Sequence, residues 1–187
     1  MMRCLAVIMV VVLAGLSGGC RYASNFRFVP QPAMVEVPTA TGEGTSVTAM
    51  TSVVGIRNRD KRARLPRCVE MRVRIDNHAA AMVVVDPHSM RLTNGLLMHF
   101  ERPIVEPLTG LTLTQGQSAS VTVYFPFPRG QNQNNTDLSS LHLQSELAVN
   151  AQPTTLMFTF TRMRPVYYHD PFWHPGHMHT GVFVRVR

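Results

Sequence analysis

The segment Cys68–Asn94, CVEMRVRIDNHAAAMVVVDPHSMRLTN, decides the fold. Its residues Val69–Asp76 alternate between apolar and charged side chains, and a strand places successive side chains on opposite faces. Turn-forming polar residues follow, and a second strand is predicted over Met82–Leu92. The run Met82–Val85 is typical of a strand buried on both faces, and the proline after it indicates a kink. We expect a tightly connected strand pair in an antiparallel sheet with one solvated face.

Segments of the same kind recur on both sides of this pair. Further strands are predicted over Thr45–Arg57, Leu96–Phe100, Leu111–Thr114, Val121–Phe127, Leu141–Val149 and Thr154–Arg162, with a final one over Val182–Val186. Turns separate them at short spacing, and no long amphipathic helix is present in the sequence. The pattern predicts an all-β sandwich in which Val73 and Ile75 are core, while Arg72 and Arg74 are exposed.

Two quoted stretches carry a family resemblance. VDPHSMRLTNG (Val85–Gly95) and LTLTQGQSASVTVYFPFP (Leu111–Pro128) follow an alternating strand and an Asp76-Asn77 turn. This order resembles the immunoglobulin-like β-sandwich domain of unknown function found in bacterial lipoproteins, the type of a secreted mycobacterial immunogenic antigen. The resemblance covers about residues 45 to 163 and implies an immunoglobulin-like antiparallel β-sandwich of about 7–9 strands. It implies no activity, because fold analogy alone does not give function.

The N-terminus is typical of a secretory signal peptide over residues 1–19. Arg3 precedes the apolar run Cys4–Leu16, which is too short for a membrane span of ~20 residues, and small residues follow. Cys20 after these small residues resembles the lipobox of bacterial lipoproteins, although Ser17 stands where that motif favours leucine. The resemblance implies a lipid such as palmitate on Cys20 and a place in the bacterial cell envelope, at the outer membrane facing the periplasm. An ordinary cleaved signal is the alternative.

Residues 20–44 are rich in proline, threonine and glycine, so we expect a lipid-anchored tether before a domain at 45–187. Its apolar residues Phe26, Phe28 and Val29 either lie on the lipid interface or dock on the domain as an edge strand. Of the three cysteines, Cys68 alone follows the proposed lipidation site. A Cys20–Cys68 disulfide is the alternative if no lipid is attached.

A basic stretch precedes the central strand pair. Its six cations are Arg57, Arg59, Lys61, Arg62, Arg64 and Arg67, within a chain of formal net charge +7. Such a stretch is a candidate contact for anionic lipid headgroups or lipopolysaccharide, and a solvated hairpin loop is the plain alternative. Nucleic acid is disfavoured as a partner by the export signal and by the lack of interleaved aromatic residues for base stacking.

Histidines suggest a second function. Four of the eight lie in the segment 165–180, namely His169, His174, His177 and His179, which we expect to form a loop with Trp173 before a final strand at 181–187. Imidazole binds copper and zinc, although the spacing matches no closed zinc motif; aromatic side chains in such a loop also stack on glycans. His88, Met90 and Met98 resemble the ligands of periplasmic copper chaperones, but methionine at strand positions also serves as core filler.

No catalytic motif is present, so we do not expect an enzyme. The sequence predicts a lipid-anchored envelope protein with a non-catalytic binding or structural role, whose partner is an envelope protein, a glycan or an anionic lipid. A periplasmic copper- or zinc-binding protein is the alternative, and apart from those metals we expect no cofactor.

Overall fold

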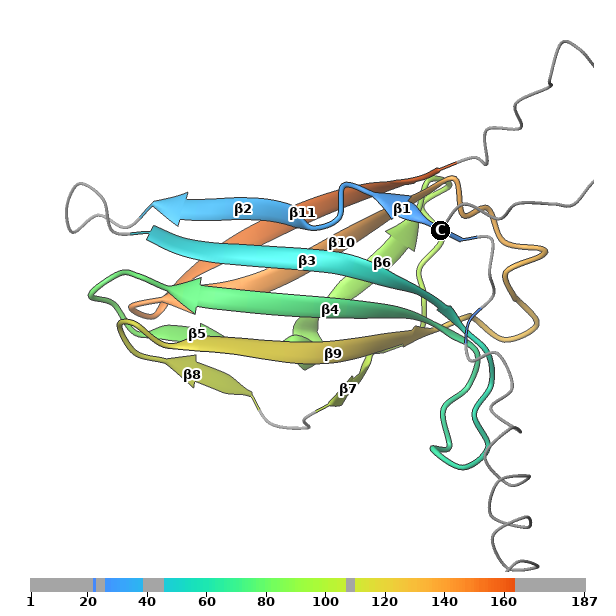
Figure 1. Ribbon diagram of the computed structural model, residues 1–187, viewed down its shortest axis with the longest axis horizontal. Helices are drawn as coiled ribbons and strands as arrows, with labels where there is room; N and C mark the ends of the chain where they lie inside the picture. The colour runs from blue at the N-terminus through green and yellow to red at the C-terminus, as the bar shows by residue number, and fades with distance from the viewer. Residues whose placement is uncertain (1–21, 23–25, 39–45, 107–109, 164–187) are drawn as a thin grey trace, which may run out of the picture.

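The protein is an all-β sandwich of two antiparallel sheets (Figure 1). The computed structural model describes residues 22, 26–38, 46–106 and 110–163. One sheet has the order β2-β3-β4-β9-β7, and the other has the order β1-β11-β10-β5-β8, with β6 also paired to β10. The all-β sandwich expected from the sequence is therefore confirmed, although the described residues form eleven strands rather than the expected 7–9.

The first sheet is built around β4. Its strands are β2 (Ala33–Pro38), β3 (Ser46–Arg57), β4 (Cys68–Asn77), β9 (Ser118–Pro126) and β7 (Ile104–Glu106). In β4 the side chains of Met71, Val73 and Ile75 are buried, whereas Arg72 and Arg74 are exposed, as the alternation predicts. Apolar side chains on the inner face and charged side chains on the outer face fix the register of this strand, because a slip by one residue would exchange the two faces.

The second sheet closes the core from the other side. Its strands are β1 (Phe28–Val29), β5 (Val83–Val85), β6 (Arg91–Asn94), β8 (Leu111–Leu113), β10 (Ser140–Val149) and β11 (Gln152–Arg162). The long hairpin β10–β11 supplies buried Leu141, Leu143, Phe158 and Phe160 to the single main core. These side chains pack against the inner face of β4 and its neighbours, so burial of apolar surface between the sheets is the main source of stability.

The central pair differs from its expected form. β4 and β5 do not pair with each other, because the chain crosses from the first sheet to the second between them. Val83 and Val85 are buried while Val84 is exposed, so β5 faces the core on one side only. The kink predicted at Asp86-Pro87 is present as a short 3-10 turn, η1 (Pro87–Ser89).

The domain begins earlier than the expected boundary at residue 45. Residues 26–38 were expected in a tether. Instead, every residue of β1 pairs with β11, and every residue of β2 pairs with β3. Phe28 is buried, which confirms its docking as part of an edge strand.

The segment Leu96–Phe100 is not a strand: it starts in a turn, and His99 makes an isolated bridge to Thr93. β7 lies in a segment for which no strand was predicted. The final strand and the loop 165–180 lie outside the described residues.

The register of β4 can be tested by a matched pair of substitutions. Ile75→Ala removes a side chain that is 2% exposed, and we expect the free energy of unfolding to fall by about 2–5 kcal/mol because a cavity is left in the core. Arg72→Ala on the opposite face should change it by no more than about 0.5 kcal/mol. Urea denaturation monitored by circular dichroism measures both, and an equal loss in the two variants would contradict the register.

Candidate functional site

A basic hairpin projects from one end of the sandwich between β3 and β4 (Figure 1). The backbone N–H groups of Asp60 and Leu65 each donate to the carbonyl oxygen of the other, at 2.9 and 3.0 Å. The Asp60 carboxylate accepts backbone N–H groups from Arg62 at 2.9 Å and Ala63 at 3.1 Å, which fixes the turn. The bond from Ala63 is the main cause that lowers the pKa of Asp60. The hairpin is therefore a closed, internally bonded structure.

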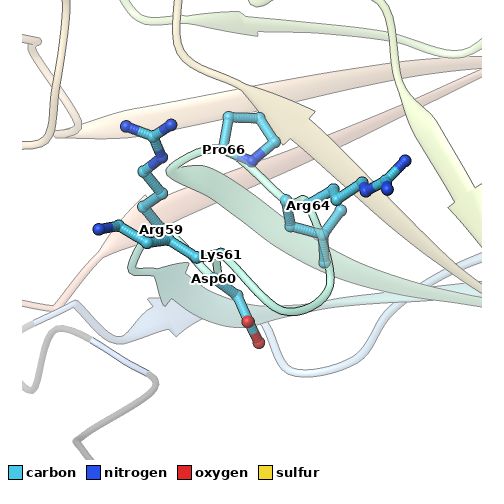
Figure 2. A pocket seen from close by; sticks show the side chains of 6 residues that line it. Arg59, Asp60, Lys61, Arg64 and Pro66 are labelled. Carbon is cyan, nitrogen blue, oxygen red and sulfur yellow. The ribbon is translucent and has the colours of Figure 1, made fainter.

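Four cations of this hairpin face solvent: Arg59, Lys61, Arg62 and Arg64. The hairpin forms an open hollow of about 330 Å³, lined by Arg59, Asp60, Lys61, Arg64, Leu65 and Pro66 (Figure 2). Figure 2 shows the charged ends of Arg59, Lys61 and Arg64 pointing away from one another and away from the Asp60 carboxylate. Leu65 is buried and packs on Cys68 and Tyr124, so the apolar base of the hairpin joins it to the sheet.

The other two basic residues of the stretch lie differently. Arg67 is half-buried at the base of the hairpin. Arg57 contacts Glu70 at 3.3 Å and Asp60 at 3.4 Å, with only 11% of its side chain exposed. It also donates to the Tyr124 hydroxyl at 3.3 Å and lies over that ring, 5.3 Å from its centroid. Of the six basic side chains predicted to contact an anionic partner, four are therefore exposed to solvent and available for that contact.

Arg57 is the centre of a polar cluster on the outer face of the first sheet. The Tyr22 hydroxyl donates to Glu70 at 3.0 Å, and the Tyr124 hydroxyl donates to Glu106 at 3.1 Å. Burial by itself would lower the pKa of Arg57, but the attraction of Tyr124 and Glu70 outweighs it and the pKa is raised. Burial is also the main cause that raises the pKa of Tyr124 to about 12, followed by the bond to Glu106. The cluster is a hydrogen-bonded network at the base of the hairpin, in which the buried Arg57 Nε is the one buried side-chain atom without a hydrogen-bond partner among the described residues.

A glycine supplies the backbone conformation on which the N-terminal part of this cluster rests. Gly55 lies at a register shift in β3 with a φ of 155°, a conformation that side chains rarely adopt. A Cβ atom there would lie 3.4 Å from the Tyr22 ring, which covers the bulge. Sequence reasoning placed Glu70 on a wet face, but it is 5% exposed because Tyr22 and Arg57 cover it. The glycine between two β-branched residues was the one signal of this bulge in the sequence.

Cys68 lies beneath the cluster and is fully buried. Burial raises the pKa of its thiol to about 12, although the nearby Arg57 charge acts in the opposite direction. A thiol is nucleophilic only as the thiolate, so Cys68 is an inert side chain at neutral pH. It packs with Leu65 and Tyr124 as a small apolar residue.

The candidate metal ligands near β6 do not converge. Met90 is completely buried in the core, whereas His88 is exposed in the 3-10 turn. The Met90 thioether fills space in the core, as methionine commonly does, and the metal role predicted for it stays a prediction. Within the described ranges, no group of three or more histidine, cysteine, aspartate or glutamate side chains could hold a metal ion. His169, His174, His177 and His179 lie outside the described residues.

An apolar tip lies at the same end of the sandwich as the hairpin. Leu96 and Leu97 are each 74% exposed in the turn after β6. The buried Asn94 side chain holds this turn, because its oxygen accepts the backbone N–H of Leu96 at 3.0 Å and of Met98 at 2.8 Å. Its amide nitrogen donates to the Asp137 carbonyl oxygen at 2.9 Å. The two leucines are therefore presented by a hydrogen-bonded turn.

Comparisons with known proteins add no function. The sequence matches no protein family and no curated protein. A solved structure of a Bordetella pertussis protein assigned to ApaA is 14% identical, with 75% of this chain and 95% of that chain covered at a TM-score of 0.32. A second target of the Northeast Structural Genomics Consortium is 8% identical, with 87% and 97% covered at a TM-score of 0.32. In the part of the chain that the structure describes, no helix is long and apolar enough to cross a membrane.

The buried ion pair predicts unequal costs for two arginine substitutions. Arg57→Met leaves the Glu70 carboxylate in a buried place without its cation, so we expect a loss of about 3–5 kcal/mol in the free energy of unfolding. Arg74→Met breaks the ion pair with Asp76, whose carboxylate is 9% exposed but keeps its hydrogen bond with Ser118; because the Arg74 side chain is 55% exposed, we expect a cost of no more than about 1 kcal/mol. The double variant Arg57→Met/Glu70→Gln should recover part of the loss. Urea denaturation measures the free energy of unfolding of each variant. Equal losses for the two arginine variants would contradict the stabilising role of the buried cluster.

The raised pKa values predict a loss of stability in alkali. Below pH 9.0 the Cys68 thiol and the Tyr124 hydroxyl are protonated in both the folded and the unfolded chain. Above that pH the unfolded chain loses these protons first, because the folded-state pKa values are about 12. Stability should therefore fall between pH 9 and about 12. Cys68→Ala removes the thiol contribution, so its melting temperature should fall less steeply over this range, and identical slopes would contradict the assignment.

Proposed function

We propose that the protein is a lipid-anchored bacterial envelope protein with a non-catalytic binding or structural role. The sequence that supports this is the order of a charged residue, an apolar run and small residues ending at Cys20. Such a cysteine is acylated in the lipoproteins that this segment resembles. The sandwich is then held on a membrane by its N-terminal end.

The observation that carries the proposal is the docking of Tyr22 on the sandwich. Its ring covers Gly55 and its hydroxyl donates to Glu70 at 3.0 Å. Only one residue separates Tyr22 from Cys20, so the two Cα atoms lie within roughly 7 Å of each other along the chain. A lipid on Cys20 would therefore hold the domain close to the bilayer, where a long tether would let it move away.

The polar cluster supports a binding or structural role over a catalytic one. Arg57 donates hydrogen bonds to both Glu70 and Tyr124, and the nearby Cys68 thiol is buried with a raised pKa. A catalytic group needs access to a substrate and a pKa near the working pH. The cluster instead holds the base of the hairpin and the N-terminal residue Tyr22 against the sheet.

Metabolic labelling tests the anchor directly. The full chain expressed in a bacterial host with radioactive palmitate should carry the label and sediment with the membranes. Cys20→Ser should lose the label and either move to the soluble fraction or remain unprocessed, because no thiol is left at the acylation position.

Cys68→Ala is the matched control, since it also removes one cysteine but leaves the proposed acylation site intact. It should keep both the label and the membrane fraction of the parent. A Cys20→Ser chain that fractionates and labels like the parent would overturn the proposal, as would loss of the label in the Cys68→Ala chain alone.

A further inference from the structure

We infer that the exposed cations of the hairpin bind the phosphate headgroups of an anionic membrane and hold this end of the sandwich on the bilayer surface. The binding residues are Arg59, Lys61, Arg62 and Arg64. The inference deepens the proposed function, since it names the partner and the face that meets it, and it rests on that function for the location of the bilayer.

Charge complementarity is the first argument. Asp60 is the one acidic residue between Arg57 and Arg67, and its carboxylate is engaged with two backbone N–H groups and with Arg57. The positive charges of the four solvent-facing cations are therefore little neutralised by acidic groups of the hairpin. A basic residue close to an anionic bilayer strengthens binding about fivefold, and the effect fades beyond a Debye length of roughly 10 Å.

The directions of the side chains favour a surface over a single small anion. A site for one phosphate ion needs cations that converge on a point. Figure 2 shows that the ends of Arg59, Lys61 and Arg64 diverge around the hollow instead. Diverging cations on a closed hairpin can each meet a separate headgroup on an extended surface.

The position of the hairpin relative to Cys20 is the second argument. Tyr22 bridges to Arg57, the last residue of β3, and the hairpin starts at the next residue. Cys20 is two residues from Tyr22 along the chain. A lipid on Cys20 would therefore bring Tyr22, and with it the hairpin next to Arg57, close to the membrane. The local concentration of headgroups around the cations would then be high, as for any second contact made after a first is fixed.

The apolar tip lies on the same end and fits the same partner. Glu101 follows this turn and donates its N–H to Pro126 at 3.0 Å, while Phe127 donates to Arg67 at the base of the hairpin at 3.3 Å. The end of β9 thus bonds both to the residue that follows the turn and to the base of the hairpin. Exposed apolar side chains at the end of the molecule that carries the cations fit a membrane interface, where apolar and basic groups bind together.

Vesicle sedimentation tests the inference without the lipid anchor. The protein is the chain 20–187 with Cys20→Ser, which contains every residue that the structure describes. It should sediment with vesicles of phosphatidylcholine and phosphatidylglycerol but not with vesicles of phosphatidylcholine alone. Lys61→Gln/Arg64→Gln in this chain should weaken the binding about 30-fold, since two cations near the surface are lost.

The control variant Arg72→Gln/Arg74→Gln removes the same net charge from exposed positions along β4. It should change the binding by no more than about twofold, because these positions lie away from the proposed contact face. Both variants should keep the melting temperature of the parent within a few degrees, which excludes unfolding as the cause. An equal loss in the two variants would overturn the inference, because net charge alone would then explain the binding.

Three other results would also overturn it: equal binding to neutral vesicles, displacement by millimolar inorganic phosphate, and binding to heparin without binding to anionic vesicles. They would indicate an apolar contact, a small-anion site and a polysaccharide partner, respectively. Because the tested chain carries no lipid, failure here leaves the Cys20 anchor standing. Failure of palmitate labelling would likewise leave the headgroup contact standing.

Discussion

The structure depends on one buried amide, that of Asn77, at the point where the chain leaves the first sheet for the second. Asn77 is fully buried at the end of β4. Its side-chain nitrogen donates to the Ala81 carbonyl oxygen at 2.7 Å and to the Leu113 carbonyl oxygen at 3.2 Å, and its oxygen accepts the Ala79 N–H at 3.0 Å. A single side chain thus closes the crossover and joins β4 to β8 in the facing sheet. A buried amide without hydrogen-bond partners would lower the free energy of unfolding by more than the same bonds raise it. The crossover is therefore restricted to the conformation in which the Asn77 amide is hydrogen-bonded.

The sequence predicted the long strands because their faces differ in solvent exposure. In β4 and β11 the apolar and polar residues alternate, and a period of two needs no knowledge of the partner strand. The crossover was missed because Asp76-Asn77 is equally typical of a hairpin turn, and only the contacts of the amide distinguish the two. β2 was missed because the prolines around it are typical of a tether, although prolines are also tolerated at sheet edges.

The candidate site was predictable in composition but not in arrangement. The six basic residues are visible in the sequence, and their position between two strands indicated a loop. The alternation of residues along a strand does not predict that Arg57 contacts Glu70 while Arg59 faces solvent. The position of Arg57 depends on the bulge at Gly55 and on Tyr22, which lies over that bulge. Met90 illustrates the opposite case. Its place beside His88 resembled a ligand pair, but the 3-10 turn directs the methionine into the core and the histidine outward.

The edges of the two sheets have a consequence for contacts between copies of the protein. If the proposed anchor confines the molecule to a membrane, copies meet side by side, where unpaired strand edges join sheets of different copies. In the described part of the fold, β1 has 2 residues and β7 and β8 have 3 each, while β2 is preceded by Pro32 and ends at Pro38. These four terminal strands present few backbone groups in line, so stacking of copies through them is disfavoured. β11 differs, because β1 pairs only with its last two residues, Thr161 and Arg162, and leaves the rest of that edge without a partner strand in the described part of the fold. A sheet shared between neighbouring copies would therefore have to form along β11.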